Sequence, residues 1–531
     1  GIAAPLASHI ATFKKYNCIS LGCPAKYALF VKRSFMRCFF VILIVLLQAT
    51  LSVAKDSLCV WIMPNGASPK EKLETELQKF TDKTGIPTKV VVLDWGEAWN
   101  RISSALEQGK DLPAVLQVGT TWIPYFASKG YLLPLNPWLS QINRERFIPV
   151  SFNTTHIEGD STIYSVPWFV DARALLANQK ILKDNGITPN ELKTYQDFRA
   201  ALRKVNQAQM KLEDGTPIEA FAFPGKSDWN IPHNFAPWIW SDGGDFIKKD
   251  ENGYRSALLD SGTLRGIAKY LDFVIDSLVN RSNLTQNTAQ IIQRFNNGEL
   301  AFILNTAEIA MLTRIASVNG GLEGSRIGND GVIVLPVPQG DAGSIGFVGG
   351  SNLSIPAKYP NKEAALKLLM FLTSDSSVDA YTKTIGFLPS VQTALVSWEK
   401  DSVYKALVEC LKYGKAYTSI PQWGEAENIL VALFSDIWAV LEFEDLYSEQ
   451  RIYGILSKYH AEMNKLLQHE NQEISFEEFQ KIWNSVIVLR ETEKQETEKT
   501  ESQNGFFKNF SVGLFVMMMI FGFAFTYRRK R

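Results

Sequence analysis

The stretch LCVWIMPNGASPKEKLETELQKFTDKTGIPTKVVV, residues 58–92, decides the fold class. It opens with a short apolar run, continues with apolar residues at helical spacing, and closes with a second apolar run. In the helical part, Leu73, Leu77 and Phe80 fall on one face. Pro69 starts this helix and Gly85 ends it. Strand, helix and strand in this order indicate a parallel sheet covered by helices.

The same alternation continues along the chain. GEAWNRISSALEQGK (96–110) predicts a second helix, AVLQVG (114–119) a third strand, and TWIPYFASKG (121–130) a third helix. Residues 168–330 are mainly helical in pattern, and two strands return in VIVLPVP (332–338) and NLSIPAKYP (352–360). Helical patterns then run to about residue 490, without an internal repeat. The predicted fold class is α/β.

Composition bounds the function. The chain has 531 residues, 46% of them hydrophobic, and 55 basic residues balance 55 acidic ones. A chain of this length can bury at least two cores. Nucleic-acid partners are not expected, because phosphate binding depends on clustered Lys and Arg, and no basic stripe is present.

The two ends carry membrane and export patterns. Met36 and Arg37 precede the apolar run CFFVILIVLL and the small residues Ser52 and Ala54, which predicts a signal peptide and a mature chain from about Lys55. Residues 510–527 are apolar enough to predict a transmembrane helix, and the basic tail 528–531 predicts that the body of the chain lies outside the cell. The polar residues 491–509 would form a stalk. A buried core helix is the alternative for 510–527.

Two cysteines, Cys59 and Cys410, lie in the predicted mature chain. Both have apolar neighbours, so buried free thiols are expected, and a single disulfide between them stays open. The sequence contains no HExxH, no GxSxG, no phosphate loop and no zinc-type CxxC pair. No metal or cofactor is expected.

Five blocks of sequence, in order, carry a family resemblance. They are VWIMPNG (60–66), DLPAVLQVGTTWIPYFASKGYLLPL (111–135), YSVPWFVDARALLANQKILKDNGI (164–187), FNNGELAFILNTAEIA (295–310), and LPVPQG (335–340) with GGSNLSIPAKYPNKEAALKLLMFLTS (349–374) and IGFLPS (385–390). Over about 58–441 the chain resembles the solute-binding proteins of ABC importers, in the large sugar-binding branch that includes maltose-binding protein.

The resemblance implies a two-lobed periplasmic-binding-protein fold with a hinge and interleaved lobes. The first lobe would comprise residues 55–166 and 339–373, and the second 167–338 and 374–490. Crossings are expected at SVP (165–167) and LPVP (335–338), where proline limits each strand. Residues beyond 441 exceed what the family needs, and form either a docking helix or a continuation of the stalk.

The implied activity is binding of a sugar or oligosaccharide between the lobes. Hydroxyl edges of a sugar need paired donors and acceptors, and its ring faces stack on aromatic side chains. The chain has thirteen Trp, many of them in loops at predicted strand ends, where open α/β sheets bind ligands.

Candidate ligand-binding residues of the first lobe follow its predicted strands. They are Asn65, Asp94, Trp95, Glu97, Thr121, Trp122, Gly350 and Ser351. The resemblance points most directly to Asn65 and to Thr121 with Trp122. The alternatives are a turn at Asn65 with Gly66, and packing of Trp122 against Phe126.

Candidates of the second lobe include residues just beyond the first crossing. They are Trp168, Asp171, His233, Trp238, Trp240, Asn305, Glu308 and Trp423. Relatives place an acidic residue facing the sugar at the position of Asp171. Many carry an aromatic platform where this chain has Glu308, which implies a different sugar, and Trp423 could supply the missing platform. Some of His233, Trp238 and Trp240 would instead pack in the core.

Three functions remain to be separated. The first is an extracytoplasmic monomeric receptor, anchored at the outer face of the membrane, that delivers a sugar to the membrane subunits of an ABC importer. The second is a tethered carbohydrate sensor or adhesion receptor with the same fold. The third is a carbohydrate-active enzyme, which would place paired carboxyls about 5–9 Å apart. The binding protein is the prediction, and no enzymatic activity is expected.

Overall fold

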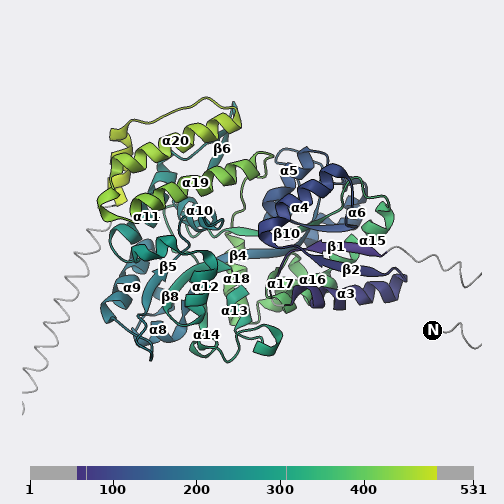
Figure 1. The fold of residues 1–531 in the computed structure, drawn as a ribbon, viewed down its shortest axis with the longest axis horizontal. Coiled ribbons are helices and arrows are strands. Elements are labelled where there is room, and N and C mark those ends of the chain that lie inside the picture. The colour runs from purple at the N-terminus through teal and green to yellow at the C-terminus, as the bar shows by residue number, and fades with distance from the viewer. Residues whose placement is uncertain (1–56, 67, 307, 487–531) are drawn as a thin grey trace, which may run out of the picture. The chain divides into compact units, whose positions relative to one another are not determined.

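The computed structural model describes residues 57–66, 68–306 and 308–486 (Figure 1). Nine strands are connected in the order β2-β1-β3-β10-β4-β8-β5, with β9 and β11 also paired to β4, and β6 and β7 form a hairpin. The strands are β1 (Leu58–Ile62), β2 (Thr88–Val92), β3 (Val115–Gly119), β4 (Val166–Asn178), β5 (Glu219–Ala222), β6 (Ile247–Asp250), β7 (Gly253–Ser256), β8 (Leu300–Thr306), β9 (Val332–Leu335), β10 (Val348–Ser354) and β11 (Leu388–Pro389).

Besides the helical residues 476–486, these helices of the described residues cover this framework. They are α3 (Pro69–Thr84), α4 (Trp95–Gln108), α5 (Ile123–Ser128), α6 (Leu139–Ile142), α7 (Pro149–Phe152), α8 (Gln179–Asp184), α9 (Tyr195–Ala208), α10 (Ile231–Ser241), α11 (Ser261–Ile275), α12 (Thr288–Asn296), α13 (Glu308–Leu312), α14 (Arg326–Asp330), α15 (Lys362–Leu372), α16 (Asp375–Ile385), α17 (Gln392–Trp398), α18 (Ser402–Lys412), α19 (Trp423–Leu441) and α20 (Glu449–Leu467).

The predicted opening of the fold is confirmed. Strands β1 and β2 pair in parallel around helix α3, and β1 also pairs in parallel with β3. Helix α3 has Pro69 in its first turn and ends at Gly85, whose φ of 66° suits glycine. Its buried face carries Leu73, Leu77 and Phe80, as the spacing predicts.

Strand β4 links two lobes. Its first half pairs with β10 up to Ala172 opposite Val348, and its second half pairs with β8 from Arg173 opposite Thr306. The two sheets therefore meet only along one strand, which passes from one lobe into the other (Figure 1). The two-lobed α/β prediction is confirmed. The change of partner lies at Ala172 and Arg173, beyond the proline at which the sequence predicted the crossing.

Packing places two segments differently from the predicted lobe assignment. Helix α16 packs on α3 of the first lobe, and Tyr381 and Ile385 of α16 are buried in the core of that lobe. Strand β11 pairs with the first-lobe half of β4, at Phe169 and Val170. These residues fall in the segment 374–490 that was assigned to the second lobe, because only their long-range contacts reveal the return to the first.

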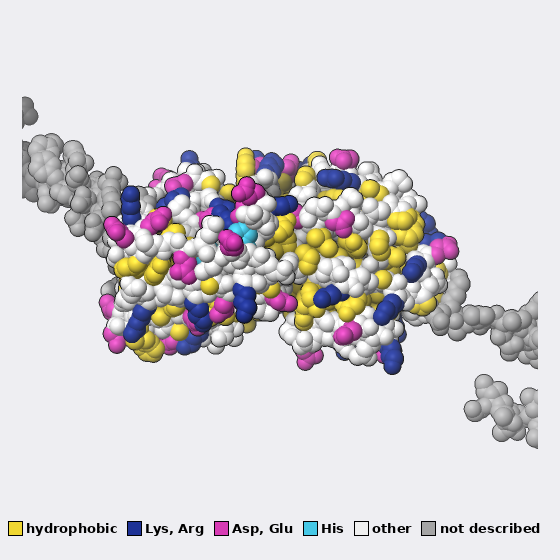
Figure 2. Space-filling model, turned by 90° about the horizontal axis from the view of Figure 1, so that it is seen from above, with side chains coloured by type: hydrophobic (Ala, Val, Ile, Leu, Met, Phe, Trp, Pro, Cys, Tyr) yellow, Lys and Arg dark blue, Asp and Glu magenta, His cyan; other side chains and the backbone are white. Residues whose placement is uncertain are grey.

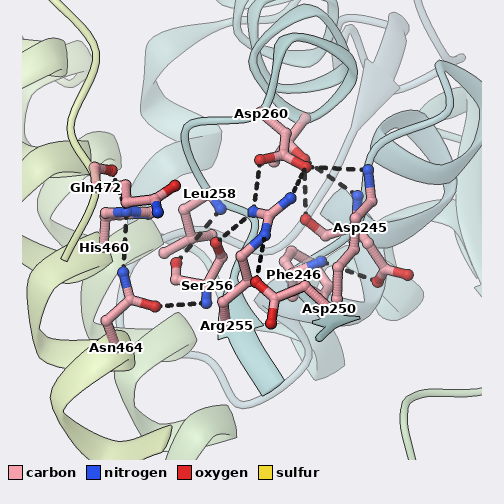
Figure 3. Close-up of polar contacts among 12 residues, drawn as sticks. Asp245, Phe246, Asp250, Arg255, Ser256, Leu258, Asp260, His460, Asn464 and Gln472 are labelled. Carbon is pink, nitrogen blue, oxygen red and sulfur yellow. Dashed lines mark hydrogen bonds and ion pairs between the residues drawn. The ribbon is translucent and has the colours of Figure 1, made fainter. Parts of the chain in front are cut away.

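The C-terminal segment docks on the second lobe. Helix α20 packs along α19 and against β7. Asn464 accepts a hydrogen bond of 2.7 Å from the Ser256 backbone N–H, and its amide nitrogen lies 3.0 Å from His460 Nε2 (Figure 3). Phe479 and Trp483 of the helical residues 476–486 are buried in the second-lobe core. Residues 442–486 thus belong to the folded body, which favours docking over a stalk for this part.

The fold-class prediction is corrected on one point. It added a C-terminal transmembrane helix, but within residues 57–66, 68–306 and 308–486 no helix is long and apolar enough to cross a bilayer. The residues that the structure describes form the two-lobed α/β fold. The predicted signal peptide, the stalk 491–509, the span 510–527 and the tail 528–531 lie outside the described residues.

Candidate ligand-binding cleft

The two lobes touch beside a narrow interlobe crevice. The start of α19 packs against the 3₁₀ turn η2 (Thr120–Trp122) and against α5 of the first lobe. Thr120, Thr121 and Pro124 face Phe347 and Tyr417 across a crevice of about 10 Å³. That volume is about enough for one water molecule. A larger ligand could enter here only if the lobes separated.

A buried amide network lies at the strand ends of the first lobe. Gln117 of β3 exchanges hydrogen bonds with Asn65, which follows β1, at 2.9 and 3.1 Å. The same Gln117 donates to Ser351 Oγ at 2.8 Å and accepts from the Met63 backbone N–H at 3.0 Å. The neighbouring strands β1, β3 and β10 therefore bring amide and hydroxyl groups together at one place. Such groups can donate to and accept from sugar hydroxyls.

Two carboxyl groups meet near the change of lobe. Asp171 Oδ1 is buried without a hydrogen-bond partner in the described part of the chain. Burial raises the pKa of Asp171 to about 6, against the smaller effect of Arg173, which lowers it. Glu308 begins α13, and burial together with the charge of Asp171 raises its pKa to about 7. A ligand hydroxyl bound to Asp171 would satisfy an oxygen that the protein leaves unpaired.

Arg173 extends this group into the second lobe. Its guanidinium donates a hydrogen bond to Asn230 Oδ1, just before α10. The same guanidinium lies 5.9 Å from the ring centroid of Phe347. Burial lowers the pKa of Arg173, and the nearby charge of Asp171 opposes that effect. Arg173 therefore connects the carboxyl pair to the aromatic side of the cleft.

Aromatic rings and one histidine form the second-lobe side. His233 of α10 stacks on Phe347 at 4.6 Å between centroids, and its Nδ1 lies 2.6 Å from the Tyr417 hydroxyl. Tyr417 stacks in turn on Trp423 at 4.3 Å. Burial, and secondarily Arg173, lowers the pKa of His233 well below its usual range, so the ring is neutral. Glu427 lies 3.8 Å from His233 Nε2, and burial raises its pKa to about 7.

Further aromatic side chains are open to solvent. Trp229 is 61% exposed and meets His233 edge-on at 5.6 Å. On the first lobe, Trp95 and Trp99 both pack edge-on against Trp122, at 5.8 and 5.3 Å. Hydrophobic side chains gather over this lobe in Figure 2, which looks at the molecule from above. Exposed rings of this kind can stack on sugar faces.

A family model covers most of the folded part, at residues 63–379, and it describes bacterial extracellular solute-binding proteins. The chain belongs to this family. Among curated relatives, the diacetylchitobiose binding protein DasA of Streptomyces coelicolor is 27% identical over 378 residues, covering 71% of this chain and 83% of the relative. The arabinooligosaccharide-binding protein of Bacillus subtilis is 23% identical and covers 59% of this chain and 67% of the relative.

Solved structures show the same fold. The maltose-bound MalE3 of T. maritima has a TM-score of 0.65 at 20% identity and covers 77% of this chain and 100% of its own. A solute-binding protein of Thermotoga lettingae bound with alpha-D-tagatose also has a TM-score of 0.65 at 20% identity, covering 77% and 99%. The predicted resemblance is confirmed.

The structure places five of the eight predicted first-lobe residues in the groups described above. Asn65 and Ser351 share Gln117, Thr121 lines the crevice, and Trp95 packs with Trp122. Of the other three, two occupy structural positions and one is exposed. Asp94 caps α4 by accepting from Gly96 N–H at 2.8 Å, Glu97 is exposed on the first turn of α4, and Gly350 adopts a φ of 129° against the backbone of Phe169.

The predicted second-lobe residues also divide into two sets. Asp171, Glu308 and His233 belong to the groups described above, and Trp423 joins them by stacking on Tyr417 but is itself buried in the second-lobe core. Trp168 is fully buried and stacks on Tyr381 at 4.7 Å, Trp238 is buried in the second-lobe core, and Trp240 donates to Asp245 at 3.1 Å. Asn305 Oδ1 accepts from the Thr306 backbone N–H at 2.7 Å. Ligand contact stays a prediction for every one of these residues.

Several cleft residues were missed by the sequence analysis. They are Gln117, Arg173, Trp229, Asn230, Tyr417 and Glu427. Gln117 could have been found as the polar residue inside the apolar run AVLQVG, and Trp229 as a tryptophan in the polar loop SDWN. Tyr417 and Glu427 give no local signal, because they reach His233 only when α19 and the segment before it fold against α10.

Metal and disulfide chemistry find no support in the part of the chain that the structure describes. No group of three His, Cys, Asp or Glu side chains there could hold a metal ion. Cys59 and Cys410 are both free, Cys59 half-buried and Cys410 buried. Burial raises the pKa of Cys410 to about 12, so this thiol stays protonated and unreactive at neutral pH.

Proposed function

We propose that this chain binds a sugar or an oligosaccharide between its lobes and delivers it to the membrane subunits of an ABC importer. The observation that carries the proposal is the composition of the facing walls: amide and hydroxyl groups on the first lobe, unpaired Asp171 at the crossing, and exposed or stacked aromatic rings on both lobes. This combination meets the two needs of a carbohydrate, hydroxyl pairing and ring stacking.

The relatives support the choice of ligand class. DasA is named for diacetylchitobiose, a relative from Bacillus subtilis for arabino-oligosaccharides, and MalE3 was solved with maltose. The resemblance implies an aromatic platform at the position of Glu308, and Trp423, which could have replaced it, is 1% exposed. The exposed ring of Trp229 is therefore the better candidate for stacking in this chain. Membership of an extracellular family supports a position outside the cytoplasmic membrane.

Binding would proceed by opening and closing of the lobes. The crevice of about 10 Å³ belongs to an arrangement with the lobes in contact, and β4 is the strand through which they could rotate. A sugar would enter the separated arrangement, and the lobes would then close onto the bound sugar. No covalent step is required of any residue, so the proposed role is binding rather than catalysis.

The test is a titration of the full chain with single sugars, followed by calorimetry and small-angle scattering. Diacetylchitobiose, arabino-oligosaccharides, maltose and tagatose are the first ligands to use. We expect saturable binding of one ligand per chain, a rise in melting temperature with ligand concentration, and unchanged sugar after incubation. The Asp171→Asn variant should bind the same ligand more weakly. Absence of binding across all four ligands, or their cleavage, would contradict the proposal.

A further inference from the structure

A cavity of about 810 Å³ lies away from the carboxyl pair. Asp171, Arg173, Glu308 and Glu427 are not among its walls. Its volume falls within the range of small-molecule sites, roughly 300–1,000 Å³. It is about eighty times the crevice between Thr121 and Tyr417.

Both lobes build this cavity. On the first lobe its walls come from α7 and α17, and α17 packs against β11 and α16. On the other side they come from α18, which packs on β9, a partner of the second-lobe half of β4. Because β4 connects the lobes and α18 packs on α17 as well as on β9, a rotation about β4 would have to change the packing between these two helices. The shape of the cavity therefore depends on the interlobe arrangement.

The walls are mainly apolar and carry balanced charge. Ile148, Val150, Leu395 and Leu411 supply aliphatic surface. Lys412 is paired with Glu409 at 2.7 Å, and Lys415 with Asp245. Burial lowers the pKa of His156, which keeps that ring neutral at pH 7. Since the wall lysines already have carboxylate partners, an anionic ligand would find no free cation in these walls, and the aliphatic surface favours an uncharged, apolar molecule.

Tyr417 belongs to both sites. It lines the cavity and the crevice, and its ring and hydroxyl hold Trp423 and His233. We propose that the cavity is a second binding site for a small, uncharged, mainly apolar molecule, and that its occupation tightens sugar binding in the cleft. This second half rests on the proposed function. A molecule bound in the cavity contacts walls from both lobes, so it would hold the lobes together around a sugar already bound in the cleft.

The experiment uses the uncharged naphthalene dye prodan and the full chain. Prodan fluorescence should report saturable binding of one dye per chain. The Val396→Trp variant places an indole at the cavity wall, on a residue that is 64% exposed and so tolerates the change. We expect this variant to bind prodan about tenfold more weakly. Val318→Trp, at a residue 90% exposed and absent from the cavity walls, is the matched control and should bind as the parent does.

The coupling between the cavity and the cleft is measured by titrating the protein with a sugar that it binds, with and without saturating prodan. Linkage requires the two ligands to tighten one another by the same factor, and we expect this factor to be about fivefold. Non-saturable dye binding, or equal binding by both Trp variants, would overturn the site. Bound dye with unchanged or weaker sugar affinity would overturn the coupling. If no sugar binds at all, the proposed function fails, while the dye titration still decides whether the cavity is a site.

Discussion

The hydroxyl of Tyr417 lies 2.6 Å from Nδ1 of His233, joining the segment before α19 to α10. Both residues are buried, and neither lies near the other in sequence. The pair fixes the His233 ring between Phe347 and Tyr417, within the second-lobe side of the proposed sugar site.

Removing this hydroxyl should weaken sugar binding. In Tyr417→Phe the ring stacking on Trp423 remains, but His233 loses its partner. If the released His233 ring then loses one hydrogen bond of about 1 kcal/mol to the bound sugar, the dissociation constant should rise about fivefold. Calorimetric titration measures the dissociation constant of each variant. Tyr413→Phe is the matched control, because Tyr413 is 68% exposed, and its affinity should equal that of the parent. Equal loss in both variants would contradict a role for the Tyr417 hydroxyl.

A substitution at Trp229 distinguishes an effect on sugar affinity from an effect on folding stability. Its side chain is largely exposed, so Trp229→Ala should leave the melting temperature of the free protein unchanged within about 1–2 °C. If the indole stacks on a sugar ring, the affinity should fall about fivefold to tenfold. Isothermal titration and thermal melting on the same preparation give both values. Phe443→Ala removes another exposed ring outside the cleft and should change neither. A Trp229→Ala protein with parental affinity would exclude the stacking role.

The sequence predicted the elements whose signal is local. The face formed by Leu73, Leu77 and Phe80 and the stop at Gly85 appear in α3 as expected, because helical periodicity and caps are properties of neighbouring residues. The partner change of β4 at Ala172 was not predicted, since it depends on strands β8 and β10 that are distant in sequence. Only the resemblance indicated two lobes.

The same distinction holds for the site. Asp171 was identified through the resemblance, and its unpaired oxygen and raised pKa are consistent with a role in binding. Trp168 and Trp238 looked equivalent to a ligand-facing tryptophan in sequence but are core residues, because burial is decided by tertiary packing. Glu427 reaches His233 across two helices, and no local pattern indicates that contact.

Glu308 gives a prediction for pH. Its pKa is raised from 4.5 to about 7 in the folded chain, first by burial and then by Asp171. The folded state thus holds this proton more tightly than the unfolded state, and stability falls as the pH rises from about 4.5 to 7. Glu308→Gln removes the ionisable group. It should raise the free energy of unfolding by about 1–2 kcal/mol at pH 8 and by progressively less towards pH 4.

Urea unfolding across this pH range measures the effect. Glu97→Gln, the same substitution at an exposed residue of α4, is the control and should follow the parent at every pH. A gain for Glu308→Gln that does not change with pH would show that the carboxyl is not titrating there.

Asn464 should hold the C-terminal segment on the second lobe. Its side chain accepts from Ser256 N–H and contacts His460 from a position that is 2% exposed (Figure 3). Asn464→Ala would leave the Ser256 N–H buried without this acceptor, at a cost of about 1–3 kcal/mol. Hydrogen exchange should then speed up in β7 and α20 together, because these elements share the contact, while exchange in β1–β3 of the first lobe stays as in the parent.

Asn252→Ala, at an exposed turn residue between β6 and β7, is the control and should leave exchange in α20 unchanged. Faster exchange confined to β7, with α20 protected as before, would show that the apolar contacts of Phe479 and Trp483 hold the segment without Asn464.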